Sequence, residues 1–311
     1  MRVSMPDSRE SLKEKNSRKA RLRRCFSVHD GIKEYRPKST RIKIMAVLEI
    51  FVLFSLTLFL IAVLALSPAA EWQRSLTHRP FLEYSLMIVL PLLFLIILRR
   101  NWADYGLSLR NLKYHIDIAM TGLLPVAIAS IPFAFLDYRQ WNGAFVLTAV
   151  RIGLIFTLAL MLRDKPASGQ NGAAAGFGVI WIASGWTPIA AAGNALSALL
   201  FSVFFLALGE ELLFRGYIQS RMNAVFGRPF RFFGVRWGWG VLIASVLFGL
   251  MHVLNIGSIR TGTWQITWAW GFWTFFSGLV FGFLREKTGG IIVPTLLHGL
   301  PVAIANMFLG L

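Results

Sequence analysis

The stretch that decides the fold is "FFLALGEELLFRGYIQSRM", residues Phe204 to Met222. This apolar run has the length of a transmembrane helix, which needs about 20 residues, yet it contains Glu210, Glu211 and Arg215. A charged side chain near the centre of a bilayer costs about 2.5 to 3.5 kcal/mol on insertion scales. Charges that are kept at such a cost are candidates for a functional role.

The composition indicates that the rest of the chain is also embedded in a membrane. Of the 311 residues, 56% are hydrophobic and 15% are charged, whereas roughly a quarter of the residues of a soluble domain are charged. Apolar runs of helical length recur along the chain and predict an all-α fold, a polytopic transmembrane helical bundle of about 8–9 helices. The expected spans are residues 44–66, 82–98, 118–136, 144–162, 177–192, 195–218, 241–254, 264–284 and 291–311, of which 177–192 is the weakest.

The N-terminal residues 1–43 form a basic tail with 14 Lys or Arg and five acidic residues. Because the first apolar run follows directly, we expect this tail to be cytoplasmic and to contact anionic lipid headgroups rather than nucleic acid. The basic loops alternate along the chain as the positive-inside rule requires. The expected protein is therefore a multi-pass integral protein of the cell (plasma or inner) membrane. Its expected regions are the tail, N-terminal transmembrane helices over 44–192, and C-terminal core helices over 193–311.

Two charges lie in other spans. Glu49 falls about two turns into the first span and Arg151 about two turns into the fourth. The expected threading places them near opposite faces of the membrane, so we do not expect them to pair with each other. A structural or snorkelling role is favoured for both.

The charges of the opening stretch differ in their expected surroundings. Glu211 and Arg215 are four residues apart, so on a helix they pair along one face. Glu210 is rotated by about 100° from Glu211 and is left free to face a cavity. Taken alone, the stretch fits a structural charge cluster at a helix end equally well.

Two histidines extend the pattern: His252 ends "SVLFGLMH", and His298 lies in "VPTLLHGL". A glutamate and a histidine together can bind and deprotonate a water molecule, and a second histidine can donate to an oxyanion. Asn255 and Asn306 lie in the same two helices and could assist as amide donors. The residue types equally permit a metal site with Glu and His ligands, although the sequence has no HExxH motif.

These motifs resemble the CAAX-processing and bacteriocin-processing (CPBP, also called ABI) intramembrane proteases. The resemblance covers about residues 195–311. The family motifs are EExxxR, FxxxH, and a histidine followed four residues later by Asn or Asp. The matching residues are Glu210, Glu211 and Arg215, then Phe248 and His252, then His298, with Val302 at the position of the family's Asn or Asp.

The resemblance implies a glutamate-dependent intramembrane endopeptidase, a CAAX prenyl protease-like enzyme that hydrolyses peptide or membrane-protein substrates without a cofactor. It implies that Glu210 is the base, His252 its partner and His298 an oxyanion donor. Glu211 and Arg215 would form the supporting pair.

The third motif departs from the family pattern at Val302, which has no hydrogen-bond donor. Losing one oxyanion donor costs about 10² to 10³ in rate. Asn306 is some 12 Å beyond His298 along an ideal helix, and Asn255 follows His252 by one turn. Val302 is therefore the best argument for the alternative, a catalytically weakened or inactive membrane scaffold or immunity-type protein on the same fold.

A third hypothesis is a secondary transporter that couples protons through Glu210 and Arg215. Its signature is a pair of broken helices in corresponding positions of two halves, and the N-terminal half contains no partner for the broken segment near "SGWTP". The expected spans also place Glu210 about two turns from the cytoplasmic end of its helix and His252 near the far end of its own.

Overall fold

The computed structural model describes residues 38–165, 188–255 and 264–308. The basic tail up to residue 37 and the weak span up to residue 187 lie outside these residues. The first half contains α2 (Thr40–Ala65), α3 (Pro68–Thr77), α4 (Phe81–Ile97), the 3-10 turn η2 (Trp102–Tyr105), α5 (Leu112–Ile128), the 3-10 turn η3 (Ile131–Ala134) and α6 (Trp141–Met161).

The second half begins with one long helix that contains five consecutive segments. These are α7 (Pro188–Leu199), the π-helical η4 (Leu200–Ala207), α8 (Leu208–Glu211), the π-helical η5 (Leu212–Gln219) and α9 (Ser220–Phe226). The helix runs without a break through residues 192–195, where the sequence predicted a gap between two segments. A hairpin follows, then α10 (Trp239–Leu254), α11 (Trp268–Thr288) and α12 (Ile292–Phe308).

The hairpin is the one strand pair in the described part of the chain. Its strands β1 (Phe230–Phe232) and β2 (Val235–Trp237) are antiparallel, and Phe230 lies opposite Trp237. All other regular structure in residues 38–165, 188–255 and 264–308 is helical. The predicted all-α bundle is thus confirmed, with this small hairpin as an addition.

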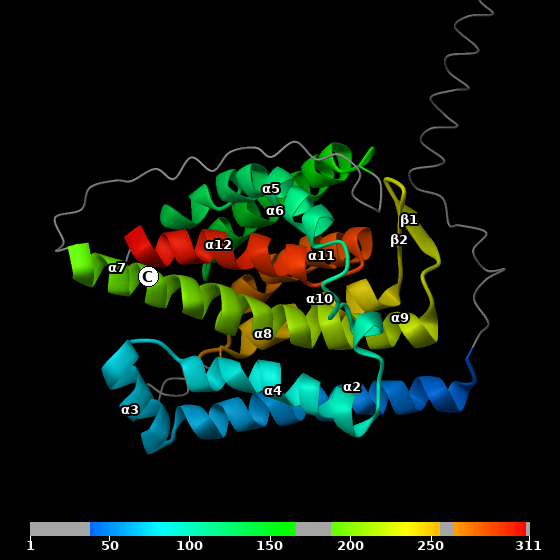
Figure 1. The fold of residues 1–311 in the computed structure, drawn as a ribbon, viewed down its shortest axis with the longest axis horizontal. Coiled ribbons are helices and arrows are strands. Elements are labelled where there is room, and N and C mark those ends of the chain that lie inside the picture. Colours follow the sequence, from blue (N-terminus) through cyan, green and yellow to red (C-terminus); the bar gives the residue numbers. More distant parts are fainter. Residues whose placement is uncertain (1–37, 166–187, 256–263, 309–311) are drawn as a thin grey trace, which may run out of the picture.

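The long α7–α9 helix lies through the middle of the bundle (Figure 1). On one side α2 and α4 pack against each other, with α3 at their turn; on the other lie α12, α11, α5 and α6. One apolar core joins α2, α4, η5, α9 and α10. A second core joins α5, α6, α11 and α12. The α8 segment, which carries Glu210 and Glu211, therefore lies between the two sides of the molecule.

Close packing of α10 on α11 depends on small residues. A Cβ atom on Gly249 would lie 2.7 Å from the Gly271 carbonyl oxygen, and one on Gly278 would lie 2.8 Å from Ser245 Cβ. Small residues of this kind let transmembrane helices approach closely. This contact fixes α10, which carries His252, against α11.

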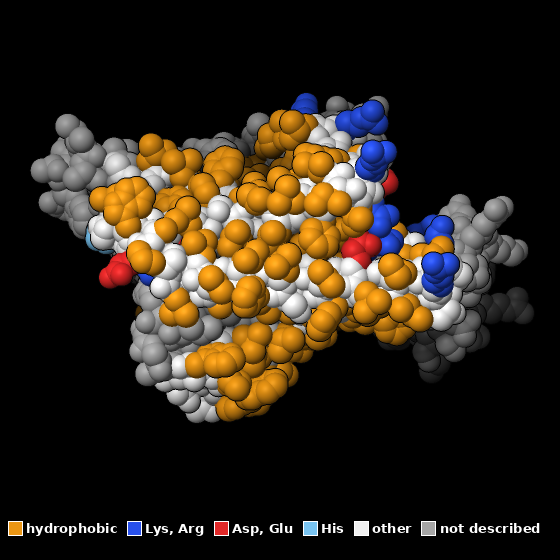
Figure 2. All heavy atoms as spheres, turned by 90° about the horizontal axis from the view of Figure 1, so that it is seen from below, with side chains coloured by type: hydrophobic (Ala, Val, Ile, Leu, Met, Phe, Trp, Pro, Cys, Tyr) orange, Lys and Arg blue, Asp and Glu red, His pale blue; other side chains and the backbone are white. Residues whose placement is uncertain are grey.

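The surface has the pattern of a membrane protein. In the described part of the chain, four helices are long and apolar enough to cross a membrane, and the bent pair α3–α4 counts as a fifth crossing if it is one span. The four helices are Thr40–Ala65, Leu112–Ala134, Trp141–Met161 and Ala195–Phe226. Shorter apolar helices cover Trp239–Leu254 and Ile292–Met307. Figure 2 shows hydrophobic side chains over the middle of one face and Lys and Arg gathered towards one end. The chain is an integral membrane protein.

Candidate active site

The long helix changes its winding on both sides of the two glutamates. The π-helical segments η4 and η5 flank the single α-helical turn α8, which is Leu208–Glu211. Single π turns inside α-helices occur frequently at functional sites. Glu210 is 3% exposed, whereas Glu211 and Arg215 are fully buried. The charges of the opening stretch are thus inside the bundle and not at its lipid-facing surface.

The helix also extends beyond its expected end at Ile218 and continues to Phe226. That expectation was wrong because the polar residues after Ile218 are buried by neighbouring helices and not by lipid. Phe226 is 16 residues beyond Glu210, about 24 Å along a helix. Glu210 therefore lies farther from the end of its helix than expected.

Helix α10 packs along the extended helix so that His252 and Glu210 lie at the same level of the bundle. Phe248 on α10 packs edge-on against Phe214, with ring centroids 5.1 Å apart. A Cβ atom on Gly240, two turns earlier on α10, would lie 2.2 Å from the Gln219 carbonyl oxygen. These two contacts make α10 antiparallel to the long helix. His252, one turn beyond Phe248, accordingly lies at the level of the glutamates.

Glu211 is the centre of the observed charge contacts. Arg215 Nη1 lies 3.2 Å from Glu211 Oε1, so the expected pairing at four residues' spacing is present. His298 Nδ1 donates to the same oxygen atom at 3.0 Å. A carboxylate with two partners of this kind holds both side chains in fixed orientations.

Aromatic rings enclose the Arg215 guanidinium. Its Cζ atom lies 4.4 Å from the ring centroid of Phe248, 5.4 Å from Phe281 and 5.8 Å from Phe214. Nη2 also donates to the Gly278 carbonyl oxygen at 3.4 Å. Cations are attracted to ring faces at such distances. Arg215 is thus fixed by the helices on either side of it.

His298 connects the two glutamates. Its ring is stacked on Phe281, with centroids 4.8 Å apart and planes 16° apart. Because Nδ1 donates to Glu211, the other ring nitrogen, Nε2, faces Glu210 and lies 3.8 Å from its Oε2 atom. Nothing in the aromatic-rich sequence of α11 distinguished Phe281, so sequence reasoning missed this contact.

Glu210 itself makes no hydrogen bond to any residue that the structure describes. Its nearest titratable neighbour is the His298 imidazole, whose Nε2 lies 3.8 Å from Oε2, a distance beyond direct hydrogen bonding. This is the arrangement expected of a carboxylate that is left free to contact a water molecule.

Phe248 connects His252 to His298 and the two glutamates. Its Nδ1 donates to the Phe248 carbonyl oxygen at 2.8 Å, and its ring packs edge-on against Phe248 at 4.6 Å and Trp270 at 5.2 Å. The Phe248 ring also packs against His298, at 6.4 Å. With its hydrogen on Nδ1, His252 keeps a lone pair on Nε2. His252 is therefore near the glutamates and is arranged as an acceptor.

The two asparagines have different surroundings. Asn306 Nδ2 donates to Ser202 Oγ on η4 at 2.9 Å, which anchors it two helical turns from His298. Asn255 ends α10 in a left-handed conformation with φ of 41°. The Asn306 amide is thus bound to Ser202 and not to Glu210 or His298, and a role for either asparagine stays a prediction.

The other two membrane charges have partners of their own. Glu49 accepts hydrogen bonds from Tyr217 Oη at 2.7 Å, Arg221 Nε at 3.0 Å and Arg100 Nη2 at 3.1 Å. Arg151 lies over the rings of Phe133 and Trp273, at 5.3 and 6.0 Å. Both fit the structural role favoured from sequence, although sequence reasoning did not identify the partners.

The residue types of the motifs also permitted a metal site with Glu and His ligands. Among residues 38–165, 188–255 and 264–308, no group of three or more His, Cys, Asp or Glu side chains is placed to hold a metal ion.

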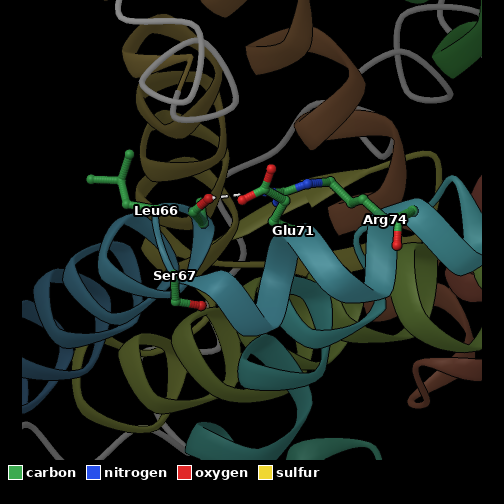
Figure 3. Close-up of a pocket in the computed structure, with 6 residues that line it drawn as sticks. Leu66, Ser67, Glu71 and Arg74 are labelled. Atoms are coloured by element: carbon green, nitrogen blue, oxygen red, sulfur yellow. Dashed lines mark hydrogen bonds between the residues drawn. The ribbon is translucent and has the colours of Figure 1, made fainter.

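A surface pocket of about 530 Å³ lies at the turn between α2 and α3 (Figure 3). It is lined by Ala65, Leu66, Ser67, Glu71, Arg74 and Ser75. Arg74 Nη2 donates to the Ala65 carbonyl oxygen at 3.2 Å, and Nη1 pairs with Glu83 Oε1 at 2.6 Å. None of the predicted site residues lines this pocket, so it is separate from the candidate active site.

Comparison with known proteins gives one match. Residues 192–304 match the family model described as "Type II CAAX prenyl endopeptidase Rce1-like". No curated protein matches the chain, and no solved structure matches it. The matched region contains all six motif residues and Val302. The resemblance read from the three motifs is therefore confirmed: residues 192–304 of this chain are similar to the Rce1-like CAAX prenyl endopeptidases.

Proposed function

We propose that this protein is an intramembrane endopeptidase that hydrolyses a peptide bond with a water molecule activated by Glu210. The observation that carries the proposal is the position of His298: its Nδ1 is bound to Glu211 while its Nε2 lies 3.8 Å from Glu210. A free carboxylate beside an oriented imidazole, within the membrane interior, is the combination that water activation requires.

In the proposed reaction Glu210 takes a proton from water as the oxygen attacks the peptide carbonyl carbon. His252 accepts a hydrogen bond from the same water at Nε2, since its Nδ1 is already bound to Phe248. The carbonyl oxygen becomes an oxyanion, and His298 donates to it from Nε2 when both ring nitrogens carry protons. Glu210 then gives its proton to the leaving amine as the carbon–nitrogen bond breaks.

Glu211 and Arg215 act as positioning residues in this scheme. Glu211 directs Nε2 of His298 towards Glu210, and Arg215 offsets the charge of Glu211. Active-site side chains need such supports because small errors in their placement slow the reaction strongly. The proposed substrate is a peptide or a membrane protein. A substrate of the CAAX type is proposed only because the matched family is described as CAAX prenyl endopeptidases.

The experiment is proteolysis of a peptide library by the purified full-length protein in detergent, read by mass spectrometry. Glu210→Ala and His252→Ala are tested beside the wild type, and Glu71→Gln is the control because it removes an exposed carboxylate on α3. We expect cleavage by the wild type and the control, and none by the other two variants. Cleavage that survives Glu210→Ala would overturn the proposal.

The second candidate is a non-catalytic scaffold on the same fold, and Val302 in the third motif is the observation that favours it. In that case no variant or wild-type protein cleaves any peptide. A folded wild type that leaves the whole library intact would therefore favour the scaffold.

A further inference from the structure

Helix α3 is too short to cross a membrane. Its ten residues measure about 15 Å, half the thickness of a hydrocarbon core of about 30 Å. The next helix, α4, has 17 residues, which lies within the range of about 17 to 25 residues for a single crossing. The two helices are bent by 117° from each other, so α3 lies across the ends of α2 and α4 instead of extending either of them (Figure 1).

Polar contacts hold α3 at this angle. Arg74 Nη1 pairs with Glu83 Oε1 at 2.6 Å, and Nη2 donates to the Ala65 carbonyl oxygen at 3.2 Å. The neighbouring Gln73 donates to Glu83 through Nε2 and accepts from the Leu82 amide at 2.8 Å. Gln73 and Glu83 are buried. One face of α3 is thus fixed against α2 and α4, which also fixes the directions of its other faces.

Two further faces of α3 are exposed, and they differ in polarity. Trp72 and Leu76 are four residues apart and therefore share one face; they are 66% and 63% exposed. Glu71 and Ser75 are also four residues apart and exposed, and their face is rotated by about 100° from that of Trp72 and Leu76. An apolar strip and a polar strip thus run side by side along the outside of α3.

Each strip continues into a surface of matching character. The apolar strip follows the end of α2, where Val63 and Leu66 are 52% and 63% exposed. Figure 2 shows hydrophobic side chains along this side of the molecule. The polar strip borders the pocket of Figure 3, because Glu71 and Ser75 line it together with Ser67. The apolar strip is therefore continuous with the lipid-facing surface of a span, and the polar strip with a polar pocket.

Neither water alone nor hydrocarbon alone suits this helix. In water, Trp72 and Leu76 would remain exposed without the gain from burying apolar surface. In the hydrocarbon core, Glu71 would carry the cost of an intramembrane charge. The boundary between lipid and water satisfies both strips, and tryptophan is enriched at that level of membrane proteins.

We infer that α3 is an interfacial helix whose partner is the lipid surface. Trp72 and Leu76 insert at the boundary between the headgroups and the acyl chains, while Glu71 and Ser75 face water. Helix α4 then crosses the membrane by itself. Because a Cβ atom on Gly209 would lie 3.1 Å from the Tyr84 carbonyl oxygen of α4, anchoring α4 also fixes the depth of α8 in the bilayer. The inference is independent of the proposed peptidase activity.

The test uses a fluorescent probe at single cysteines of the full-length chain. Cys25 is the one cysteine of the sequence, so Cys25→Ser gives a background without cysteine. Trp72→Cys and Leu76→Cys report on the apolar strip, and Glu71→Cys and Ser75→Cys are the matched controls on the polar strip. Each protein is labelled with the environment-sensitive fluorophore NBD and placed in phosphatidylcholine nanodiscs, in which water reaches both membrane surfaces.

We expect the probes at positions 72 and 76 to emit at shorter wavelength and to be quenched by nitroxide lipids. A nitroxide near the headgroup should quench them about twofold or more better than one at the end of the acyl chain, since interfacial helices lie only about 5 to 10 Å into the boundary. The probes at positions 71 and 75 should instead be quenched by iodide. Two positions on each strip keep the test valid if one variant fails to fold.

Three results would overturn the inference. Equal quenching by iodide at all four positions would place α3 in water. Stronger quenching at positions 72 and 76 by the nitroxide at the end of the acyl chain would place α3 inside the hydrocarbon core, as half of a broken span. Protection of these two positions from iodide and from both nitroxide lipids would show that protein, not lipid, covers the apolar strip.

Discussion

His298 is held in place by Glu211, whose Oε1 atom lies 3.0 Å from His298 Nδ1. The contact joins α12 to the turn between two π-helical segments, across 87 residues of sequence. It leaves Nε2 of the imidazole facing Glu210, the first glutamate of the motif. Glu211 also pairs with the buried Arg215, so one carboxylate holds both the histidine and the arginine.

Replacing Glu211 with Gln should lower both activity and stability. Loss of a group that orients a catalytic or metal-binding histidine typically costs about 10- to 100-fold, and we expect such a fall in kcat. The fully buried Arg215 would also lose its counter-charge, which costs about 3 to 5 kcal/mol. Initial rates and the unfolding midpoint in detergent measure the two effects.

The double variant Glu211→Gln, Arg215→Met separates these effects. Removing both charges of a buried pair is often neutral for stability, so the unfolding midpoint should recover towards the wild-type value while kcat stays low. Recovery of both quantities would contradict the orienting role of Glu211.

Replacing Glu49 with Gln should destabilise the protein without a direct effect on chemistry. Glu49 accepts from Arg221 and Arg100, which would be left without their carboxylate. Because these side chains are 10% and 32% exposed, we expect a loss of about 2 kcal/mol, less than for a fully buried pair. Chemical unfolding in detergent measures it, with Glu71→Gln as the control; a stability equal to wild type would contradict the structural role.

Replacing Gly299 with Ala should disturb the helix that carries His298. A Cβ atom there would lie 2.8 Å from Val203 Cα on η4, and overpacking of this kind costs about 1 to 3 kcal/mol. Gly153→Ala is the matched control, because a Cβ atom on this helical glycine meets nothing within 4 Å. We expect a lower unfolding midpoint and a lower kcat for Gly299→Ala alone. Equal behaviour of the two variants would show that α12 is not closely packed on η4.

Replacing Arg151 with Met should leave catalysis unchanged. Arg151 lies against Phe133 and Trp273 and donates to the Ala129 carbonyl oxygen at 3.5 Å, and no predicted site residue is among these partners. A charge in the membrane interior is costly, so the variant should be as stable as the wild type or more stable. A fall in kcat at unchanged stability would assign Arg151 to the active site.

Several features could be predicted from the sequence because they depend on local spacing. The lengths of the apolar runs predicted the helices, and the four-residue interval between Glu211 and Arg215 predicted their pairing. The motif residues His252 and His298 were identified by type and surroundings. Each of these inferences uses neighbours along one helix, whose geometry is nearly constant.

Features that depend on contacts between helices could not be predicted in this way. The extension of the long helix to Phe226 was missed because the polar residues after Ile218, which the structure buries, are typical of a loop. The contact of His298 with Glu211 requires α12 to run beside η4, and the close contact of α4 with α8 requires these helices to meet at Gly209. No sequence interval encodes these contacts, since they are set by the packing of distant segments.

In the proposed mechanism Glu210 activates water for peptide hydrolysis. The most direct test is the initial cleavage rate of Glu210→Gln on a peptide that the wild type cleaves. The substitution keeps the shape of the side chain and removes the base. Loss of a general base lowers the rate by about 10² to 10⁴, and we expect a fall in that range with the unfolding midpoint unchanged. A folded Glu210→Gln protein that cleaves at the wild-type rate would contradict the account.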